Sequence, residues 1–160
     1  MMGTGKSTLG KIVAKMLNIK FIDTDFNIEK NCSMKIHEIF KKKGEEFFRH
    51  QEEQEVIKSL KKNNSVVAVG GGAFINKKIR DAILKNSISI WLDLNLKTLY
   101  KRTKWSKKRP LLEGENTEEI IKKLYNERKN IYKLAKYKIN CDGISKKKIA
   151  KKIISFYEKY

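Results

Sequence analysis

The sequence predicts a single α/β domain in which a parallel sheet lies between layers of helices, forming a three-layer sandwich. Three observations lead to this prediction. A glycine-rich loop opens directly into an amphipathic helix, β-branched runs alternate with helical patterns along the chain, and 160 residues suffice to bury one core. No stretch approaches the roughly 20 apolar residues of a membrane span, so we expect a cytoplasmic protein that does not bind membranes.

The first half of the chain alternates between helical and extended patterns. Apolar residues recur on one face over 6–17, which predicts a helix, and "KFID" at 20–23 predicts a short buried strand. Ser33 is expected to cap a helix over 34–43. A glycine should end that helix, and a longer helix should follow over 45–62.

The second half continues the alternation and ends in a helix. "KWSKKRPLLEGEN" at 104–116 has no periodicity and contains the only proline, so we expect a lid loop there. Asn116 and Glu119 form a good capping pair for the helix that follows. The remaining expected elements are a strand at 65–69, a helix at 76–85, a strand at 87–94, helices at 95–103 and 117–135, a strand at 137–141 and a helix at 145–160.

The chain carries a formal net charge of +19, which raises the question of nucleic-acid binding. Lysines are spread over nearly every expected helix and form no stripe with interleaved aromatic residues. We therefore interpret the charge as a feature of composition and expect no nucleic-acid partner. Only five of the 37 cationic residues are arginines, and an arginine kept among lysines suggests a need for its planar, bidentate fork.

The motif with the most chemical meaning is the loop Gly3-Thr4-Gly5-Lys6-Ser7. It matches the second half of the phosphate-binding pattern G-x-x-x-x-G-K-[ST], and a helix follows it directly. Backbone N–H groups of such a loop curl around a phosphate at the helix N-terminus. Lys6 would reach the β- and γ-phosphates of ATP, and the Ser7 hydroxyl would bind Mg²⁺.

Three further features are expected at the same edge of the sheet. Asp23 and Asp25 follow the first strand, where one carboxylate can face a magnesium-bound water and the other a substrate hydroxyl. The triplet 70–72 is all glycine and permits close approach of a ligand to backbone N–H groups. Arg109, in the expected lid, could close over the transferred phosphoryl group.

Taken in order, the motifs "GTGKS", "DTD", "FRHQE", "GGG" and "RPLL" resemble the shikimate kinase family of P-loop proteins over essentially the whole chain. The resemblance implies a P-loop NTPase sandwich with five parallel strands in the order 2-3-1-4-5. It also implies ATP-dependent phosphorylation of the 3-hydroxyl of shikimate, with Mg²⁺ as cofactor. On this basis we expect residues 1–160 to form one monomeric kinase domain, with a shikimate-binding subregion at 24–55.

The resemblance also implies roles for individual residues. Glu52 would hold Arg49 in place, and Phe40 and Phe48 would line the shikimate pocket. The implied residues are Lys6, Asp25 and Arg109 for catalysis; Gly3, Thr4, Gly5, Lys6, Ser7, Thr8, Arg102 and Arg109 for ATP; Asp25, Arg49, Gly71, Gly72 and Arg128 for shikimate; and Ser7 and, through water, Asp23 for Mg²⁺.

The sequence departs from the family pattern at its start, because the hydrophobic strand expected before Gly3 is absent. In the family order this strand 1 is the centre of the sheet, so we expect a gap there and interpret the start as a truncated reading or a fragment. Two other functions stay open. One is another small-molecule kinase, such as a gluconate or nucleoside monophosphate kinase, and the other is a non-catalytic basic binding protein.

Overall fold

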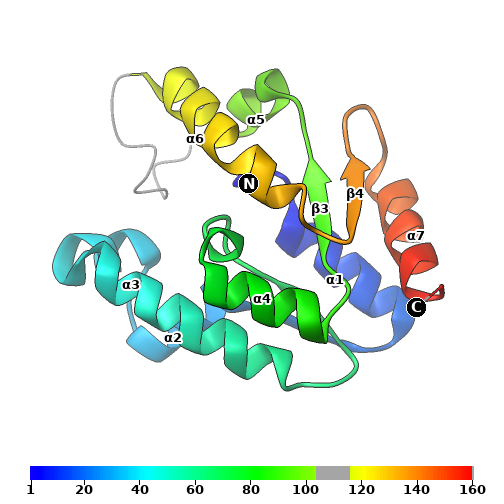
Figure 1. Cartoon of the computed structure of the whole chain (residues 1–160), viewed down its shortest axis with the longest axis horizontal. Coiled ribbons are helices and arrows are strands. Elements are labelled where there is room, and N and C mark those ends of the chain that lie inside the picture. The colour runs from blue at the N-terminus through cyan, green and yellow to red at the C-terminus, as the bar shows by residue number, and fades with distance from the viewer. Residues whose placement is uncertain (104–115, 160) are drawn as a thin grey trace.

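The computed structural model describes residues 1–103 and 116–159, which alternate between helices and short parallel strands (Figure 1). The strands are β1 (Lys20–Asp23), β2 (Ser65–Ala68), β3 (Ile90–Asp93) and β4 (Tyr137–Asn140). The helices are α1 (Lys6–Leu17), α2 (Thr24–Cys32), α3 (Ile36–Leu60), α4 (Lys77–Asn86), α5 (Leu96–Thr103), α6 (Thr117–Tyr132) and α7 (Lys146–Tyr157), with a 3₁₀ turn η1 at Ala73–Ile75.

The strands form two separate parallel pairs. β1 pairs with β2 from Lys20 opposite Ser65 to Asp23 opposite Ala68, and β3 pairs with β4 from Ile90 opposite Tyr137. Within the described residues no strand joins β2 to β3. The order β1-β2, gap, β3-β4 is the expected order 2-3-1-4-5 with the position of strand 1 unfilled, which confirms the α/β fold and the expected central gap.

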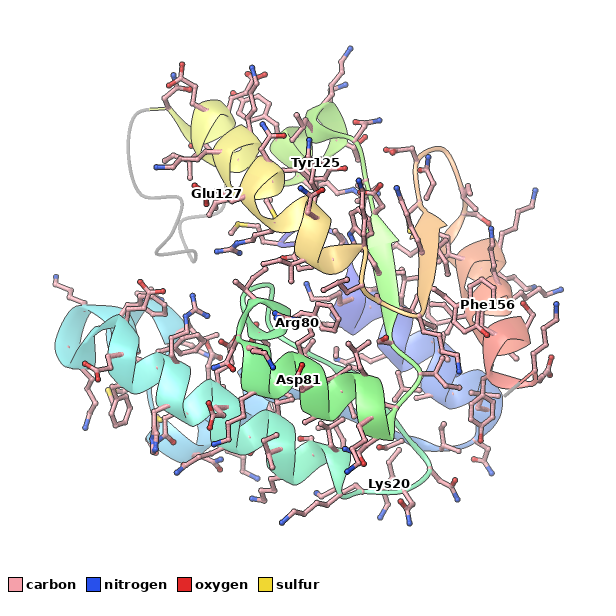
Figure 2. All side chains as sticks on the ribbon, in the orientation of Figure 1. Lys20, Arg80, Asp81, Tyr125, Glu127 and Phe156 are labelled. Carbon is pink, nitrogen blue, oxygen red and sulfur yellow. The ribbon has the colours of Figure 1, made fainter. Side chains whose placement is uncertain are left out.

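Helices cover both faces of the strands. In the view of Figure 1, α1 passes behind β3, whereas α4 lies on the viewer's side. α1 packs against β1, β2 and α7, and α7 is fixed to β4 by Phe156, which stacks on Tyr137 with ring centroids 4.1 Å apart (Figure 2). No helix in the described ranges is both long and apolar enough to cross a membrane.

The gap between β2 and β3 is an apolar cavity of about 700 Å³. Side chains of α1, β2 and β3 line it, among them Val13, Val67 and Trp91. The indole Nε1 of Trp91 is buried and has no hydrogen-bond partner among the described residues. Met1 also lines the cavity, and burial holds the pKa of its amine well below its usual value, while Lys6 lowers that pKa further. The two sheet halves are therefore joined through helices and loops and not through a continuous ladder.

The expectation for Ser33 is wrong, and a helix was missed before it. α2 begins after Asp23, whose carboxylate accepts a hydrogen bond from the Phe26 N–H at 3.3 Å. Ser33 ends this helix in the left-handed region, with φ 50°, and Lys35 is the N-cap of α3. Gly44, at φ 82° and ψ 168°, is not helical and divides α3 at a kink into two helical stretches, as the expected helices over 34–43 and 45–62 required.

Candidate functional site

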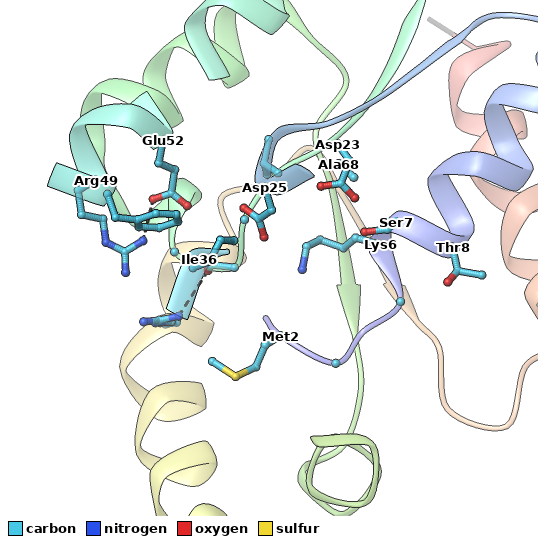
Figure 3. A pocket seen from close by; sticks show the side chains of 18 of the residues that line it. Met2, Lys6, Ser7, Thr8, Asp23, Asp25, Ile36, Arg49, Glu52 and Ala68 are labelled. Atoms are coloured by element: carbon cyan, nitrogen blue, oxygen red, sulfur yellow. Dashed lines mark hydrogen bonds and ion pairs between the residues drawn. The ribbon is translucent and has the colours of Figure 1, made fainter. Parts of the chain in front are cut away.

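The phosphate loop and the carboxyl ends of β1 and β2 meet at one pocket of about 440 Å³ (Figure 3). Lys6 extends from the start of α1 towards Asp25, which is in the first turn of α2. Arg49 enters from α3 and Arg128 from α6. Parallel strands expose their carboxyl ends at the same edge, which is why residues so far apart in sequence converge there.

The loop at 3–5 is shaped to present backbone N–H groups. Gly3 and Gly5 have φ of 74° and 85°, a left-handed conformation that side chains disfavour. Gly5 is also the N-cap of α1 and offers no side chain to its N–H groups, so this helix start is open to an anion. Lys6 Nζ donates to the Met1 carbonyl at 2.8 Å, which holds the ammonium over the loop.

Asp25 has the most perturbed carboxylate in the pocket. Its Oδ1 is buried and has no hydrogen-bond partner among the described groups. Burial raises its pKa from 3.8 to about 6; Lys6 opposes this shift, and the Glu52 carboxylate adds to it. A carboxylate whose pKa lies near the pH of the medium is suited to accept a proton from a hydroxyl.

The glycine triplet brings charged side chains close to the backbone. A Cβ at Gly70 would lie 2.4 Å from Glu52 Oε1 and 2.8 Å from Asp25 Oδ1, and a Cβ at Gly72 would lie 2.4 Å from Arg49 Nη1. Any larger residue at these two positions would push those groups away. The glycines therefore allow Glu52, Asp25 and Arg49 to lie against the backbone, and they also leave room for a ligand.

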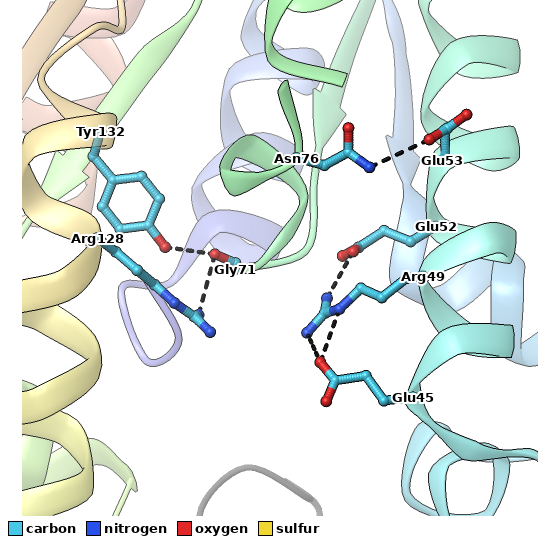
Figure 4. A network of polar contacts seen from close by, with 8 residues as sticks. All are labelled: Glu45, Arg49, Glu52, Glu53, Gly71, Asn76, Arg128 and Tyr132. Atoms are coloured by element: carbon cyan, nitrogen blue, oxygen red, sulfur yellow. Dashed lines mark hydrogen bonds and ion pairs between the residues drawn. The ribbon is translucent and has the colours of Figure 1, made fainter. Parts of the chain in front are cut away.

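Two carboxylates hold Arg49 (Figure 4). Its Nη1 donates to Glu52 Oε2 at 2.7 Å, while its Nε and Nη2 donate to Glu45 Oε1 at 3.1 and 2.9 Å. Burial alone would lower the pKa of Arg49, but Glu52 and Glu45 outweigh it and the net shift is upward. Burial raises the pKa of Glu52, and Arg49 opposes that shift.

Arg128 faces Arg49 from the other side of the pocket (Figure 4). Its Nη1 approaches the Gly71 carbonyl at 3.5 Å, and the Tyr132 hydroxyl donates to the same oxygen. Tyr132 stacks at a tilt on Trp91, which anchors it in the core. The Gly71 carbonyl thus links α6 to the glycine triplet.

Arg80 has a structural position beside the glycine triplet. Its Nη1 donates to the carbonyls of Phe74 and Ile75 at 3.1 and 2.9 Å, which closes the η1 turn after the glycine triplet (Figure 2). This arginine lies outside the pocket and supports it. The other described arginines, Arg49, Arg102 and Arg128, line the pocket itself.

The residues expected to bind magnesium fit an ion that also has phosphate ligands. Ser7 and Asp23 both line the pocket, and both side chains carry oxygen atoms. The described residues contain no group of three or more acidic, histidine or cysteine side chains able to hold a metal alone. Mg²⁺ normally keeps several waters and binds through one or two protein oxygens plus substrate phosphates, which suits this sparse set.

Most of the described residues expected from the sequence line this pocket, and Thr4 does not. The expected residues that line it are Gly3, Gly5, Lys6, Ser7, Thr8, Asp23, Asp25, Phe40, Phe48, Arg49, Glu52, Gly71, Gly72, Arg102 and Arg128. Thr4 is buried under the loop, where its hydroxyl donates to the Met1 carbonyl at 3.1 Å. Arg109 lies outside the described residues, as does most of the expected lid at 104–116.

Sequence reasoning missed several residues that shape the pocket. Met2 and Ile36 line it, and Glu45 and Tyr132 hold groups that do. The i,i+4 spacing of Glu45 and Arg49 was a usable signal for their ion pair. The contact of Tyr132 with Gly71 spans 61 positions and had no local signal.

Comparison with known proteins gives one consistent result. Residues 2–158 match the family model described as shikimate kinase. The chain is 42% identical to the shikimate kinase of Bartonella henselae over 160 residues, which are 100% of this chain and 76% of that protein. It is also 42% identical to that of Sulfurihydrogenibium sp. over 154 residues, 96% of this chain and 92% of that protein.

Solved structures agree with the sequence comparison. Shikimate kinase from Acinetobacter baumannii, in complex with shikimate, superposes with a TM-score of 0.95 at 31% identity and covers 99% of this chain and 89% of that one. The enzyme from Aquifex aeolicus superposes with a TM-score of 0.86 at 33% identity, over 99% and 92% of the respective chains.

Proposed function

Since this chain belongs to the shikimate kinase family, we propose that it transfers the γ-phosphoryl group of ATP to the 3-hydroxyl of shikimate. The observation that supports this most strongly is the meeting of three groups in one pocket: the phosphate loop, Asp25, and the facing pair Arg49 and Arg128. These three suit, respectively, a polyphosphate, a hydroxyl and a carboxylate, and shikimate carries both of the latter groups.

The nucleotide half of the proposal uses the N-terminal loop. Gly3, Thr4 and Gly5 would give backbone N–H groups to the phosphates, and Lys6 would exchange its bond to the Met1 carbonyl for phosphate oxygens. Arg102, whose Nη1 lies 3.4 Å from the Gly3 carbonyl, would lie along the adenine. The remaining proposed ATP ligands are Ser7, Thr8 and Arg109.

The shikimate half uses the opposite wall. Arg49 and Arg128 would clamp the carboxylate, each with donors in a planar fork. Gly71 and Gly72 would offer backbone groups to the ring, and Phe40 and Phe48, with ring centroids 4.9 Å apart, would line its apolar side. We assign these contacts to the subregion 24–55 together with the glycine triplet and α6.

In the chemical step, the 3-hydroxyl oxygen would attack the γ-phosphorus. A new P–O bond forms to shikimate, the bond to the β–γ bridging oxygen breaks, and ADP leaves. Asp25, whose pKa of about 6 leaves it mostly ionised at neutral pH, would accept the hydroxyl proton. Lys6 and Arg109 would stabilise charge on the transferred group, and in phosphoryl transfer such stabilisation outweighs the base.

We propose Mg²⁺ as the cofactor, with Ser7 and, through a water, Asp23 as its protein ligands. When bound, it would neutralise charge on the β- and γ-phosphates. We also propose a cytoplasmic monomer with no nucleic-acid or membrane partner. Steep salt dependence of any binding to nucleic acid, in the absence of ATP turnover, would instead favour the basic binding protein.

The decisive experiment measures ADP release from MgATP by this chain with shikimate, gluconate, AMP or no acceptor. The proposal expects release only with shikimate, together with a phosphate ester at the 3-hydroxyl by phosphorus NMR. Equal release with all acceptors, or release with gluconate or AMP alone, would refute it. Asp25→Asn, which keeps the shape of the side chain, serves as a control in which release with shikimate should be reduced.

A further inference from the structure

Arg49 has one positive charge but forms ion pairs with two carboxylates, Glu45 and Glu52. Glu52 holds Nη1 at 2.7 Å with a side chain that is 2% exposed, so this contact is a fixed part of the wall. Glu45 holds Nη2 at 2.9 Å with a side chain that is 55% exposed. The two partners therefore differ in how readily solvent or a ligand could replace them.

Glu45 occupies donors that a ligand carboxylate would use. One oxygen of Glu45 accepts from both Nε and Nη2 of Arg49, and Nη1 is already bound to Glu52. Each guanidinium nitrogen thus has an internal carboxylate partner before any substrate arrives. A substrate carboxylate placed between Arg49 and Arg128 would have to share Nη2 with Glu45 or displace it.

The charge balance points the same way. With both glutamates ionised, Arg49, Arg128, Glu45 and Glu52 together carry no net charge. A carboxylate ligand adds a negative charge to this balanced group, and moving the exposed Glu45 away restores the balance locally. Glu52 cannot move in the same way because it is buried beneath Gly70, where a Cβ would lie 2.4 Å from its Oε1.

The kink in α3 gives Glu45 another favourable position. Gly44 breaks the helical conformation, so Glu45 begins the second helical stretch of α3. A carboxylate in the first turn of a helical stretch is stabilised by the free N–H groups and the helix dipole. Release from Arg49 therefore costs Glu45 little.

We propose that the Glu45 carboxylate occupies the place of the substrate carboxylate on Arg49 in the free protein. It neutralises Arg49 there and is displaced when the substrate binds. This inference rests on the proposed function. Glu45 thereby weakens substrate affinity and keeps Arg49 in a single orientation between turnovers. A residue that merely supported Arg49 would have the opposite effect on affinity, which makes the sign of the change decisive.

The test compares Glu45→Gln with Glu46→Gln, a neighbouring exposed glutamate whose substitution removes the same charge. Because exposed i,i+4 ion pairs are weak, Glu45→Gln should lower the shikimate KM and the calorimetric Kd by about two- to fivefold. Glu46→Gln should leave both near the parent values, and kcat and the ATP KM should stay unchanged in both variants. Glu45→Ala should shift affinity in the same direction as Glu45→Gln.

A shikimate KM for Glu45→Gln that equals or exceeds the Glu46→Gln value would overturn the inference. Raising the salt concentration should shrink the difference between the two variants, because salt screens the exposed pair. Failure of the proposed function would look different, since the parent chain itself would then neither bind nor phosphorylate shikimate. The inference fails only where the parent chain works and the two variants do not separate in the stated direction.

Discussion

Replacing Asp25 by Asn should stabilise the fold at neutral pH while removing the proposed base. Burial raises the pKa of Asp25 from 3.8 to about 6, so the folded state binds its proton more tightly than the unfolded state does. Keeping this carboxylate ionised at pH 8 therefore costs the fold up to about 3 kcal/mol, at about 1.4 kcal/mol per pKa unit. An amide in the same place also needs hydrogen-bond partners, so we expect a net gain of about 1–3 kcal/mol.

The pH dependence follows from the direction of that shift. Below pH 3.8 Asp25 is protonated in both states, and the parent chain pays no cost. As pH rises through about 6 the parent loses this stability, whereas the Asn variant does not. The advantage of Asp25→Asn should therefore be greatest near pH 8 and vanish near pH 4.

Thermal unfolding followed by circular dichroism at pH 4 and pH 8 measures this difference. The expected gain corresponds to an increase of about 2–10 °C in Tm at pH 8. Asp23→Asn is the matched control, because it makes the same chemical change two positions earlier and asparagine caps a helix as well as aspartate does. An unchanged or lower Tm for Asp25→Asn at pH 8, or an equal gain at pH 4, would refute the reasoning.

Four other outcomes are expected. Arg49→Lys should raise the shikimate KM at least tenfold with little change for ATP, because lysine lacks the fork; steady-state kinetics that show an unchanged shikimate KM would contradict this. The kcat/KM for shikimate should fall with slope one below about pH 6 as Asp25 becomes protonated; a flat profile from pH 5 to 7 would argue against Asp25 as base. Gly70→Ala should cost about 1–3 kcal/mol in chemical unfolding, because its Cβ would lie 2.4 Å from Glu52; an unaltered midpoint would contradict the close approach. Tyr132→Phe should cost about 1 kcal/mol by the same measurement through the lost bond to the Gly71 carbonyl; wild-type stability would mean that this bond contributes nothing.

The elements with strong local signals were predicted well. α1 and β1 begin and end where the phosphate loop, the apolar periodicity and the stretch "KFID" placed them. Asn116 caps α6 as expected, accepting from the Glu119 N–H at 3.3 Å. In each case nearby residues alone determine the structure, so the sequence carried enough information.

The elements that depend on tertiary contacts were missed or shifted. In α2 only Thr24 and Ile28 are buried, and Phe26 is 63% exposed, so its apolar pattern is too weak to predict a helix. Packing against α3, including the bond from Asn27 to Glu55 at 2.6 Å, stabilises it instead. The apolar run at 87–94 was expected to be a strand throughout, but only 90–93 pairs with β4.

The sequence predicted which residue types line the site, but it did not predict their full set of contacts or their burial. Three of the four described arginines line the pocket, as their scarcity among lysines suggested. The i,i+4 and i,i+3 spacings of Glu45 and Glu52 from Arg49 indicate both ion pairs, but the packing of α3 determines how far each glutamate is buried. No pattern in the sequence indicates which of the two partners is exposed.

The spacing of the two carboxylate-binding arginines depends on contacts between two parts of the molecule that share no strand pairing among the described residues. Arg49 belongs to the half of the protein built on β1 and β2, and Arg128 precedes β4 in the other half. Between the two parts, the described residues supply the bonds of Arg128 and Tyr132 to the Gly71 carbonyl, together with helix packing. A substrate carboxylate bound by both arginines would connect these two parts of the molecule. Shikimate should then slow amide hydrogen exchange in β2 and β3 as well as in the pocket.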